Sequence, residues 1–380
     1  MKKWTFVLAV CLCMPLGMRA TTVTHVAWGQ DEAGAPVDLY TITAAKAEVK
    51  VTTYGAHIVS VRVPNRKGEM GNVVLGRDSL QEYMNGMGTL MGATIGRFAN
   101  RIARGQFTLD GKTYQIPTGP NGVALHGGTV GFNKKTWSAK EIPNGVEMTL
   151  VSPDGDMGFP GTLTTKVQFT LTEVHGNPAL TLHYTATTDK PTVVNFTNHA
   201  FFNLADDSST PVFNDLARID ADSYTVLDDK GVPTGEILPV AGTPLDFTTM
   251  HAIGDKIPER GYDHSYVLRA PSLKSPVVEV DDPVSGRTIQ AFTTEPGLQL
   301  FVPKFGARPP AAPGAPAGPP AGAPNAPRFP SLSAFTLETQ HFPDAPNHPN
   351  FPTTELLPGK TFQSTTIYVF GVMKETPKSR

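Results

Sequence analysis

The sequence predicts an all-β protein, a large antiparallel β-sandwich with few short helices. Short runs in which every second residue is apolar recur from Val37 onward, which is the period of strands with one buried face. Turn residues separate these runs, and almost no segment has the apolar spacing of an amphipathic helix. Many strands joined by regular turns are typical of antiparallel sheets packed face to face.

The expected strands follow one another from residue 37 to residue 370. Asp110 and Gly111 lie between two of them and predict a hairpin, as do residues 176–178, Gly-Asn-Pro, farther on. The one modest helix candidate is residues 79–84, where Ser79 could cap a turn or two. The apolar strand positions are Val37 and Leu39; Val49 and Val51; Val59, Val61 and Val63; 107–109; 114–116; Val167, Phe169 and Leu171; Leu180, Leu182 and Tyr184; 334–337; and 367–370.

Residues 1–20 have the pattern of a secretory signal peptide. Lys2 and Lys3 precede an apolar run over residues 4–16, and Ala20 closes the segment with a small side chain. The run is short for a transmembrane span, and no later stretch approaches one. We therefore expect export to the periplasm or outside the cell, without membrane insertion. The alternatives are a retained membrane anchor and, ranked second, a lipid attached at Cys11.

Composition excludes several classes of function. Both cysteines, Cys11 and Cys13, lie in the expected signal peptide, so the exported chain would have no thiol or disulfide and must be stabilised by burial. The formal charge is −2, and loss of the three cations of the signal peptide takes it to −5. Nucleic-acid binding needs clustered cations and a positive balance, so we expect a neutral small-molecule partner instead.

The chain after the signal peptide, residues 21–380, is expected to form one domain and to act as a monomer. No repeat of fixed period is present, which disfavours a propeller or a solenoid. Residues 306–330 stand out because nine of the chain's 35 prolines fall in them, mixed with Ala and Gly. Such a composition cannot pack a core and prefers extended or disordered conformations. Strand-like sequence resumes at residue 334, so we interpret this segment as a loop insertion, not a linker.

Residues 195–204, N-F-T-N-H-A-F-F-N-L, place one histidine among amides, a hydroxyl and aromatic rings. The β-branched run before them favours a strand, which would put His199 near a strand end. The amides of Asn198 and Asn203 could fix the imidazole tautomer or hold a polar ligand. Phe201 and Phe202 suit stacking on a sugar ring or packing a core. Taken alone, a structural histidine is the simpler interpretation.

Residues 96–105 set Asn100 and Arg101 side by side, where they could grip adjacent hydroxyls. The arginines of this stretch, Arg97, Arg101 and Arg104, could equally be solvated charges. Residues 125–128, L-H-G-G, put His126 before two glycines, which let a loop bend sharply and let a ligand approach. An exposed histidine in a glycine turn is the alternative.

Three later stretches each offer one polar side chain at a strand. Asp263 precedes an apolar run, where its carboxylate could hold two sugar hydroxyls or cap a turn. Residues 297–301 alternate like a strand and could aim Gln299 inward. Glu338 ends an apolar strand, and a carboxylate fixed at a strand end is well placed to act as a base.

The sequence lacks the common motifs of metal and covalent catalysis. His341 and His348 invite a metal interpretation, but no H-E-x-x-H occurs, and Pro343 and Pro346 exclude a helical i, i+4 pair. There is also no G-x-S-x-G and no glycine-rich phosphate loop with its lysine. These absences disfavour a metal site and leave covalent catalysis without a candidate residue.

Taken in order, five motifs resemble those of the aldose 1-epimerase (galactose mutarotase) family: G-R-F-A-N-R-I, L-H-G-G, N-F-T-N-H-A-F-F-N-L, Y-D-H-S-Y-V-L and L-E-T-Q-H-F-P-D-A-P-N. The resemblance spans residues 37–372. It implies a galactose mutarotase-like supersandwich with a sugar in an open cleft on one sheet and no cofactor. On matching positions, Glu338 would be the general base and His199 the general acid. The residues lining the sugar site would be Asn100, Arg101, His126, Asp263 and Gln299.

The resemblance also implies an isomerase that interconverts the α and β anomers of free aldoses such as glucose and galactose. Two departures bear on it. The family more often has Tyr where this chain has Phe201, which removes a hydroxyl near His199, and the proline-rich run is longer than expected. Two alternatives remain: a glycoside hydrolase with Asp263 and Glu338 as its carboxylate pair, and a non-catalytic carbohydrate-binding module on the same sandwich. An epimerase that acts on a phosphorylated hexose would need more cationic side chains at the cleft and would be expected in the cytosol.

Overall fold

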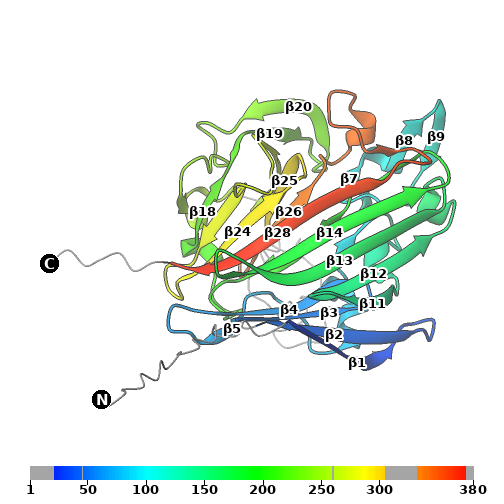
Figure 1. The fold of residues 1–380 in the computed structure, drawn as a ribbon. Coiled ribbons are helices and arrows are strands. Elements are labelled where there is room, and N and C mark those ends of the chain that lie inside the picture. Colours follow the sequence, from blue (N-terminus) through cyan, green and yellow to red (C-terminus); the bar gives the residue numbers. More distant parts are fainter. Residues whose placement is uncertain (1–20, 45, 259–260, 304–331, 374–380) are drawn as a thin grey trace, which may run out of the picture.

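Three large antiparallel sheets make up the body of the protein in the computed structural model (Figure 1). The structure describes residues 21–44, 46–258, 261–303 and 332–373, so the expected signal peptide and the proline-rich segment lie outside the described residues. The prediction of an all-β sandwich with few short helices is confirmed. In the part of the chain that is described, no helix is long and apolar enough to cross a bilayer.

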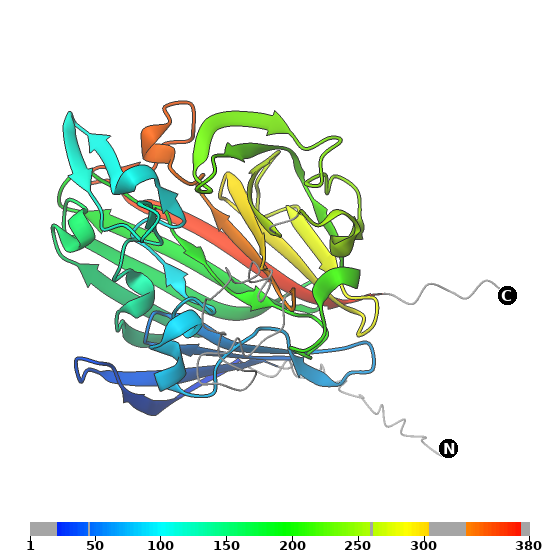
Figure 2. The same cartoon turned by 180° about the vertical axis from the view of Figure 1, so that it is seen from behind.

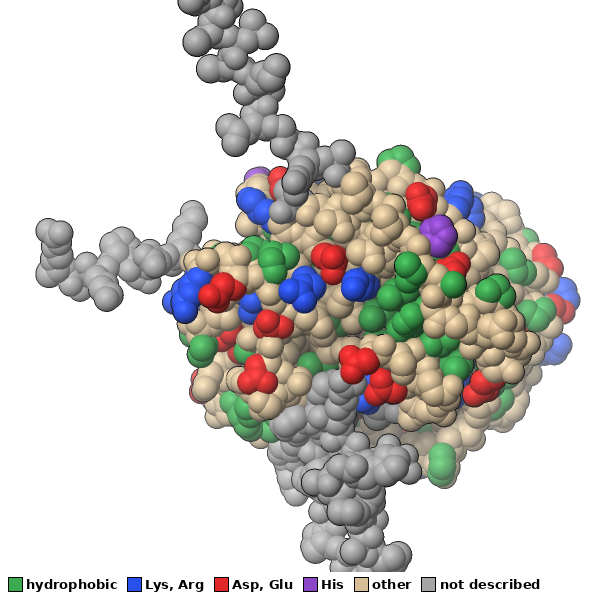
Figure 3. All heavy atoms as spheres, turned by 90° about the horizontal axis from the view of Figure 1, so that it is seen from below, with side chains coloured by type: hydrophobic (Ala, Val, Ile, Leu, Met, Phe, Trp, Pro, Cys, Tyr) green, Lys and Arg blue, Asp and Glu red, His purple; other side chains and the backbone are tan. Residues whose placement is uncertain are grey.

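The first sheet is a meander of five strands at the N-terminal end of the described chain. Its outer face carries cations and anions interspersed (Figure 3), so no single charge dominates that side. Its strands, in both chain and sheet order, are β1 (Thr22–Gln30), β2 (Pro36–Ala44), β3 (Ala47–Thr52), β4 (His57–Pro64) and β5 (Met70–Asn72).

The second sheet has nine strands and the third has six, and the third carries three of the seven residues predicted for the site, Asp263, Gln299 and Glu338. The nine, in sheet order, are β11 (Ser138–Ile142), β12 (Gly145–Ser152), β13 (Leu163–Val174), β14 (Asn177–Thr188), β28 (Phe362–Val372), β24 (Arg287–Thr293), β23 (Val278–Asp281), β18 (Leu216–Ile219) and β21 (His251–Ala252). The six are β17 (Phe201–Phe202), β26 (Phe335–Gln340), β25 (Gly297–Val302), β22 (Tyr262–Leu268), β19 (Ala221–Leu227) and β20 (Pro233–Pro239).

Short strand pairs and single helical turns fill the spaces around these sheets, many of them on the side shown in Figure 2. The pairs are β6 (Thr94–Ile95) with β16 (Thr197–Asn198), β7 (Arg101–Ile102) with β10 (Ala124–Leu125), β8 (Gln106–Leu109) with β9 (Lys112–Gln115), and β15 (Thr192–Val193) with β27 (Glu355–Leu356). The turns are α1 (Leu80–Tyr83), η1 (Gly86–Thr89), η2 (Ala103–Gly105), η3 (Phe132–Lys134), η4 (Asp156–Gly158), η5 (Val212–Asn214), η6 (Ile253–Lys256) and η7 (Ala345–Asn347).

Alternate residues of all three sheets meet in one apolar core. Val49 of β3, Val167 of β13 and Leu337 of β26 are each buried in it. Burying one such side chain stabilises the fold by about 1.5–3 kcal/mol. Because successive side chains of a strand point to opposite faces, the neighbours of Leu337 point away from this core. One of those neighbours is Glu338, so core packing on one face of β26 sets the direction of the carboxylate on the other.

The predicted hairpins are present, with one shift in a turn. The Asp110-Gly111 turn joins β8 to β9 as expected. The other turn uses His175 and Gly176, with φ of 51° and 77°, while Asn177 and Pro178 already begin β14. Two residues of positive φ match the twist of paired strands, which is why the chain reverses one position early. The predicted helix forms as α1, but Ser79 makes no side-chain cap.

Candidate active site

His199 and Glu338 meet because strand β17, just after the histidine, pairs with β26. Phe201 lies opposite Thr336 in this antiparallel pair. The main chain of His199 is held on both sides, since its N–H donates to the Ala93 carbonyl and its own carbonyl accepts from Gly92, each at 2.9 Å. The histidine Nε2 lies 3.7 Å from the Glu338 Oε1, and the two side chains are only 5 % and 2 % exposed.

The surroundings of Glu338 set its proton affinity. Burial raises the pKa of this carboxyl above its usual value, and the neighbouring His199 and a hydrogen bond from Thr336 act against that rise. The Thr336 Oγ1 donates to Oε1 at 3.0 Å, whereas Oε2 is buried without a partner among the described residues. A buried carboxylate of raised proton affinity is suited to accept a proton and return it.

Asp263 and Gln299 extend the polar surface beside Glu338. Gln299 lies opposite Glu338 in the pairing of β25 with β26, and its amide donates to Asp263 Oδ1 at 2.6 Å. Arg101 donates to the other carboxylate oxygen of Asp263 at 2.9 Å. A second guanidinium N–H contacts the Asn100 side-chain oxygen at 3.3 Å. These groups form a fixed row of donors and acceptors that suits adjacent hydroxyls on a ring.

His126 has its proton placed by the backbone. The N–H of Asn100 donates to its Nδ1 at 3.1 Å, so in the neutral ring the proton sits on Nε2. Burial, with smaller effects of His199 and Arg101, holds the pKa of His126 well below its ordinary value. Its ring lies 5.3 Å from that of His199. His126 is therefore a neutral hydrogen-bond donor beside the acid–base pair.

The glycines after His126 are needed for close approach. Gly127 has φ of 85°, and a Cβ there would lie 2.0 Å from the Gly96 carbonyl oxygen. Any side chain at this position would push the His126 loop away from the segment of Gly96 and Arg97 that leads to Asn100. The interpretation of this segment as an exposed glycine turn is wrong, because His126 is 9 % exposed.

A search against protein families matches the aldose 1-epimerase family model over residues 38–369. The chain belongs to the aldose 1-epimerase family. Galactose mutarotase from Sus scrofa is 37 % identical over 357 residues, which cover 92 % of this chain and 99 % of the relative. Aldose 1-epimerase from Escherichia coli (strain K12) is 33 % identical over 352 residues, or 89 % of this chain and 96 % of the relative.

Solved structures of aldose 1-epimerase relatives share the fold. Galactose 1-epimerase from Lactobacillus acidophilus superposes with a TM-score of 0.78 at 23 % identity, covering 93 % of this chain and all of that one. An aldose epimerase homologue from C. elegans gives 0.76 at 24 % identity with the same coverage. These likenesses confirm the predicted galactose mutarotase-like sandwich.

For this member of the aldose 1-epimerase family, the structure brings together all seven residues predicted for the site. The amides predicted to serve His199 do not reach it. Asn198 donates to the Gly92 carbonyl at 2.7 Å, and Asn203 donates to three carbonyls, including that of Ser333 at 2.7 Å. The Nδ1 of His199 is buried with no hydrogen-bond partner among the described residues. The ring of Phe201 lies 4.8 Å from the ring of His199. As a phenylalanine, it has no hydroxyl that could serve the imidazole.

Arg97 is a buried structural residue and not a solvated charge. Its guanidinium donates to Ser152 Oγ and the Pro160 carbonyl, each at 2.9 Å, and to the carbonyls of Ser152 and Pro153, each at 2.7 Å. Burial lowers the pKa of Arg97 to about 10, so it remains charged at neutral pH. Arg104, by contrast, is exposed, as the same interpretation predicted. Arg97 differs from Arg104 only in the residues that surround it in the folded protein.

Sequence reasoning missed Thr336, Phe301 and His57 as neighbours of the pair. Thr336 could have been found, because residues i and i+2 of a strand share a face with Glu338. The ring of Phe301 lies 6.1 Å from that of His199. No sequence signal points to His57, which lies 142 residues before His199. His57 contacts the Met91 carbonyl and so supports the segment that is hydrogen-bonded to the main chain of His199.

The histidines considered for a metal are each engaged elsewhere. His341 Nδ1 lies 2.6 Å from Glu295 Oε2, and His348 Nε2 lies 3.1 Å from Asp344 Oδ2. Within the described part of the chain, the group that could hold a cation is instead His126, His199 and Glu338, whose ligand atoms lie within 4.8 Å of one another. Coordination by His126 Nε2 would move its proton to Nδ1, against the Asn100 N–H, so this set is better suited to proton transfer than to metal binding.

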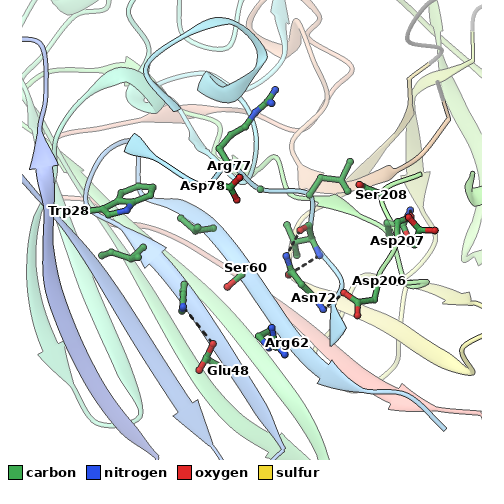
Figure 4. Close-up of a pocket in the computed structure, with 17 residues that line it drawn as sticks. Trp28, Glu48, Ser60, Arg62, Asn72, Arg77, Asp78, Asp206, Asp207 and Ser208 are labelled. Carbon is green, nitrogen blue, oxygen red and sulfur yellow. Dashed lines mark hydrogen bonds and ion pairs between the residues drawn. The ribbon is translucent and has the colours of Figure 1, made fainter. Parts of the chain in front are cut away.

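A separate pocket of about 470 Å³ lies on the outer face of the five-stranded sheet (Figure 4). It is lined by Trp28, Ser60 and Arg62, among others, and by none of the predicted site residues. Several of its polar groups already pair within the protein, as Lys50 does with Glu48 at 3.9 Å and the Asn72 N–H with Asp206 at 2.5 Å. The seven residues that the structure brings together therefore lie outside this hollow.

Proposed function

We propose that this protein is an aldose 1-epimerase that interconverts the α and β anomers of free aldoses such as glucose and galactose. Anomers interconvert when the sugar ring opens to the aldehyde and closes again on the other face. Opening removes a proton from the anomeric hydroxyl and delivers one to the ring oxygen. The site supplies a base and an acid beside each other, which is what these two transfers require.

In the proposed mechanism Glu338 is the general base and His199 is the general acid. Glu338 accepts the proton of the anomeric hydroxyl while His199 gives a proton to the ring oxygen, and the bond between the anomeric carbon and the ring oxygen breaks. Rotation about C1–C2 turns the other aldehyde face toward the hydroxyl. Ring closure then reverses both transfers, so enzyme and proton count end unchanged. Asn100, Arg101, His126, Asp263 and Gln299 orient the hydroxyls.

The observation that carries this proposal is the 3.7 Å separation of His199 Nε2 and Glu338 Oε1 in a buried site. The anomeric oxygen and the ring oxygen are bonded to the same carbon, so their partners must also lie close together. Burial excludes water and strengthens the interaction of both groups with the sugar. The family relatives described above support the same reaction.

The competing functions fit the site less well. A glycoside hydrolase would use Asp263 as its second carboxylate, but Arg101 and Gln299 each occupy one of its oxygens. That arrangement suits a residue that positions hydroxyls. A carbohydrate-binding module would have no use for a buried acid–base pair. A phosphorylated hexose would need cations beyond Arg101, which is the cation supplied by the predicted site residues.

Polarimetry on freshly dissolved α-D-glucose and α-D-galactose tests this function. We expect Glu338→Gln or His199→Ala to lower turnover by about 10² to 10⁴, because each removes one positioned proton donor or acceptor. Glu236→Gln, at an exposed site on β20, serves as the matched control and should leave the rate unchanged. An unchanged rate in either active-site variant would exclude that residue from the mechanism, and release of reducing sugar from oligosaccharides would favour the hydrolase.

We further propose that the protein is exported by residues 1–20 and acts as a soluble monomer in the periplasm or outside the cell. The support is the charged, then apolar, then small-residue pattern of this segment. Cell fractionation with mass determination of the mature N-terminus and size-exclusion chromatography test the two statements. Retention of the first 20 residues would contradict export by cleavage.

A further inference from the structure

Gln340 has a buried amide that nothing in the described chain satisfies. We propose that Gln340 is a positioning residue for the base, and that its amide holds an ordered water molecule against Oε2 of Glu338. This inference rests on the proposed function, because it gives Gln340 a role only if Glu338 transfers protons. Gln340 is not among the residues that the sequence analysis assigned to the site.

Strand geometry places Gln340 beside Glu338 on the same face. The two are i and i+2 in β26, and the hydrogen bond from Thr336 to Glu338 shows that this face is shared by alternate residues. Thr336 lies on one side of Glu338 and satisfies Oε1. Gln340 lies on the other side, and the remaining oxygen, Oε2, has no partner among the described residues.

The unsatisfied atoms come in a complementary set. Gln340 is fully buried, and neither its Oε1 nor its Nε2 has a hydrogen-bond partner among the described residues. Leaving a buried polar group unpaired costs about 1–3 kcal/mol, and more for a charged group. The amide of Gln340 can donate and Oε2 of Glu338 can accept. The two groups therefore stand two residues apart on one face of β26, and each lacks a hydrogen-bond partner among the described residues.

The spacing of alternate residues along a strand is compatible with one water molecule between these two groups. Alternate residues of a strand lie about 6.7 Å apart, whereas a water that accepts one hydrogen bond and donates another links atoms about 5–6 Å apart. Gly297 lies opposite Gln340 and has no side chain. The ring of Phe342 packs there, since a Cβ on Gly297 would lie 2.9 Å from its Cδ1. Polar buried sites of this kind hold conserved waters.

The strand end beyond Gln340 is fixed in place. The Asn195 side chain accepts from the His341 N–H at 2.9 Å and donates to the His341 carbonyl at 3.1 Å.

The proposed water would accept a hydrogen bond from Gln340 Nε2 and donate one to Glu338 Oε2, which favours the ionised carboxylate. The charged and titratable groups that also act on Glu338 are His199, His126, Asp263, Arg101 and Tyr368.

Gln340→Leu tests the role, because leucine fills a similar volume without an amide. We expect kcat to fall about tenfold or more with KM within twofold, since the base loses a donor but the sugar contacts stay. The acid limb of the pH profile should move to higher pH, because the carboxylate without its donor binds its proton more tightly. Gln363→Leu, at an exposed position of β28, is the matched control.

Unchanged kcat and an unchanged acid limb in folded Gln340→Leu would overturn the proposal. A loss of kcat with no movement of the limb would also overturn it, because it would indicate a merely structural role. If the variant does not fold, a high-resolution crystal structure of the wild-type protein decides. A water within about 3 Å of both Gln340 Nε2 and Glu338 Oε2 is expected there, and its absence would refute the inference. That water would remain even if Glu338→Gln kept full activity, so the two failures are distinguishable.

Discussion

His57 is a single buried residue that is connected to the main chain of His199 through residues 91–92. Its Nδ1 lies 2.7 Å from the Met91 carbonyl and its Nε2 lies 3.2 Å from the Asn133 carbonyl. The next residue after Met91 is Gly92, whose N–H donates to the His199 carbonyl. A neutral imidazole has one N–H and can donate to only one of its two carbonyls. Burial nevertheless lowers the pKa of His57 to about 4, so the ring is neutral under working conditions.

This ionisation predicts a loss of stability in mild acid. The unfolded chain takes up a proton near pH 6.5, whereas the folded chain resists it down to about pH 4, so protonation favours unfolding as the pH falls between these values. The loss amounts to about 3 kcal/mol by pH 4. Chemical unfolding of wild type and His57→Gln at pH 7 and pH 4 measures it. The variant should lose less stability, and equal losses in both proteins would contradict a neutral buried His57.

Asn195 acts at the scale of elements, because it joins the segment that leads into β16 to the end of β26. Its amide makes both hydrogen bonds to the main chain of His341, while its own N–H donates to the Arg97 carbonyl at 2.9 Å. His199 follows Asn195 by four residues, and Glu338 precedes His341 by three. One buried amide thus ties together the two segments that carry the acid and the base.

Asn195→Ala should therefore lower stability and activity together. It leaves a buried N–H and a buried carbonyl unpaired, which costs about 2–4 kcal/mol. We expect turnover to fall as well, since the acid and base lose a shared support. Thermal unfolding and polarimetry measure the two effects, with Asn85→Ala, at an exposed position, as the control. A variant that loses stability but keeps full turnover would show that Asn195 supports the fold alone.

The strands could be predicted from the sequence because burial of one face imposes a period of two, and residues such as Val167 and Leu182 follow it without interruption. The meeting of the seven predicted residues in one place could be expected because their types and order follow the family motifs. The hydrogen-bond partners of Asn195, Asn198 and Arg97 could not be predicted from the sequence. Each reaches a carbonyl that is distant along the chain, as Asn195 does to His341, 146 residues away, and a carbonyl looks the same in every residue.

At the scale of the whole molecule, the proline-rich insertion leaves and rejoins the body at one point. The Leu332 N–H donates to the Pro303 carbonyl at 2.8 Å, so the described ends of this segment are already paired like the ends of a turn. Leu332 in turn accepts from the N–H of Val212 at 2.9 Å. The described residues on either side of this segment are therefore joined to each other and to the body of the sandwich.

Replacing residues 304–331 with a three-residue Gly-Ser turn should preserve the fold and the reaction. Shortening a loop whose ends are already in contact changes closure entropy by only about 1–2 kcal/mol. We expect a similar unfolding temperature and kcat within about twofold of the full-length chain. Circular dichroism and polarimetry check both. A raised KM with normal kcat would instead assign the insertion a part in substrate binding.

The main chain and the side chain of Asn100 have separate roles, because the hydrogen bond to His126 comes from the main chain alone. The placement of the imidazole proton depends on a peptide N–H, which every amino acid except proline supplies. The side chain at the same position is thus free to diversify during evolution, within the limit that its φ of 64° favours Asn or Gly. Related proteins can change the hydroxyl contact at this position while inheriting the same tautomer.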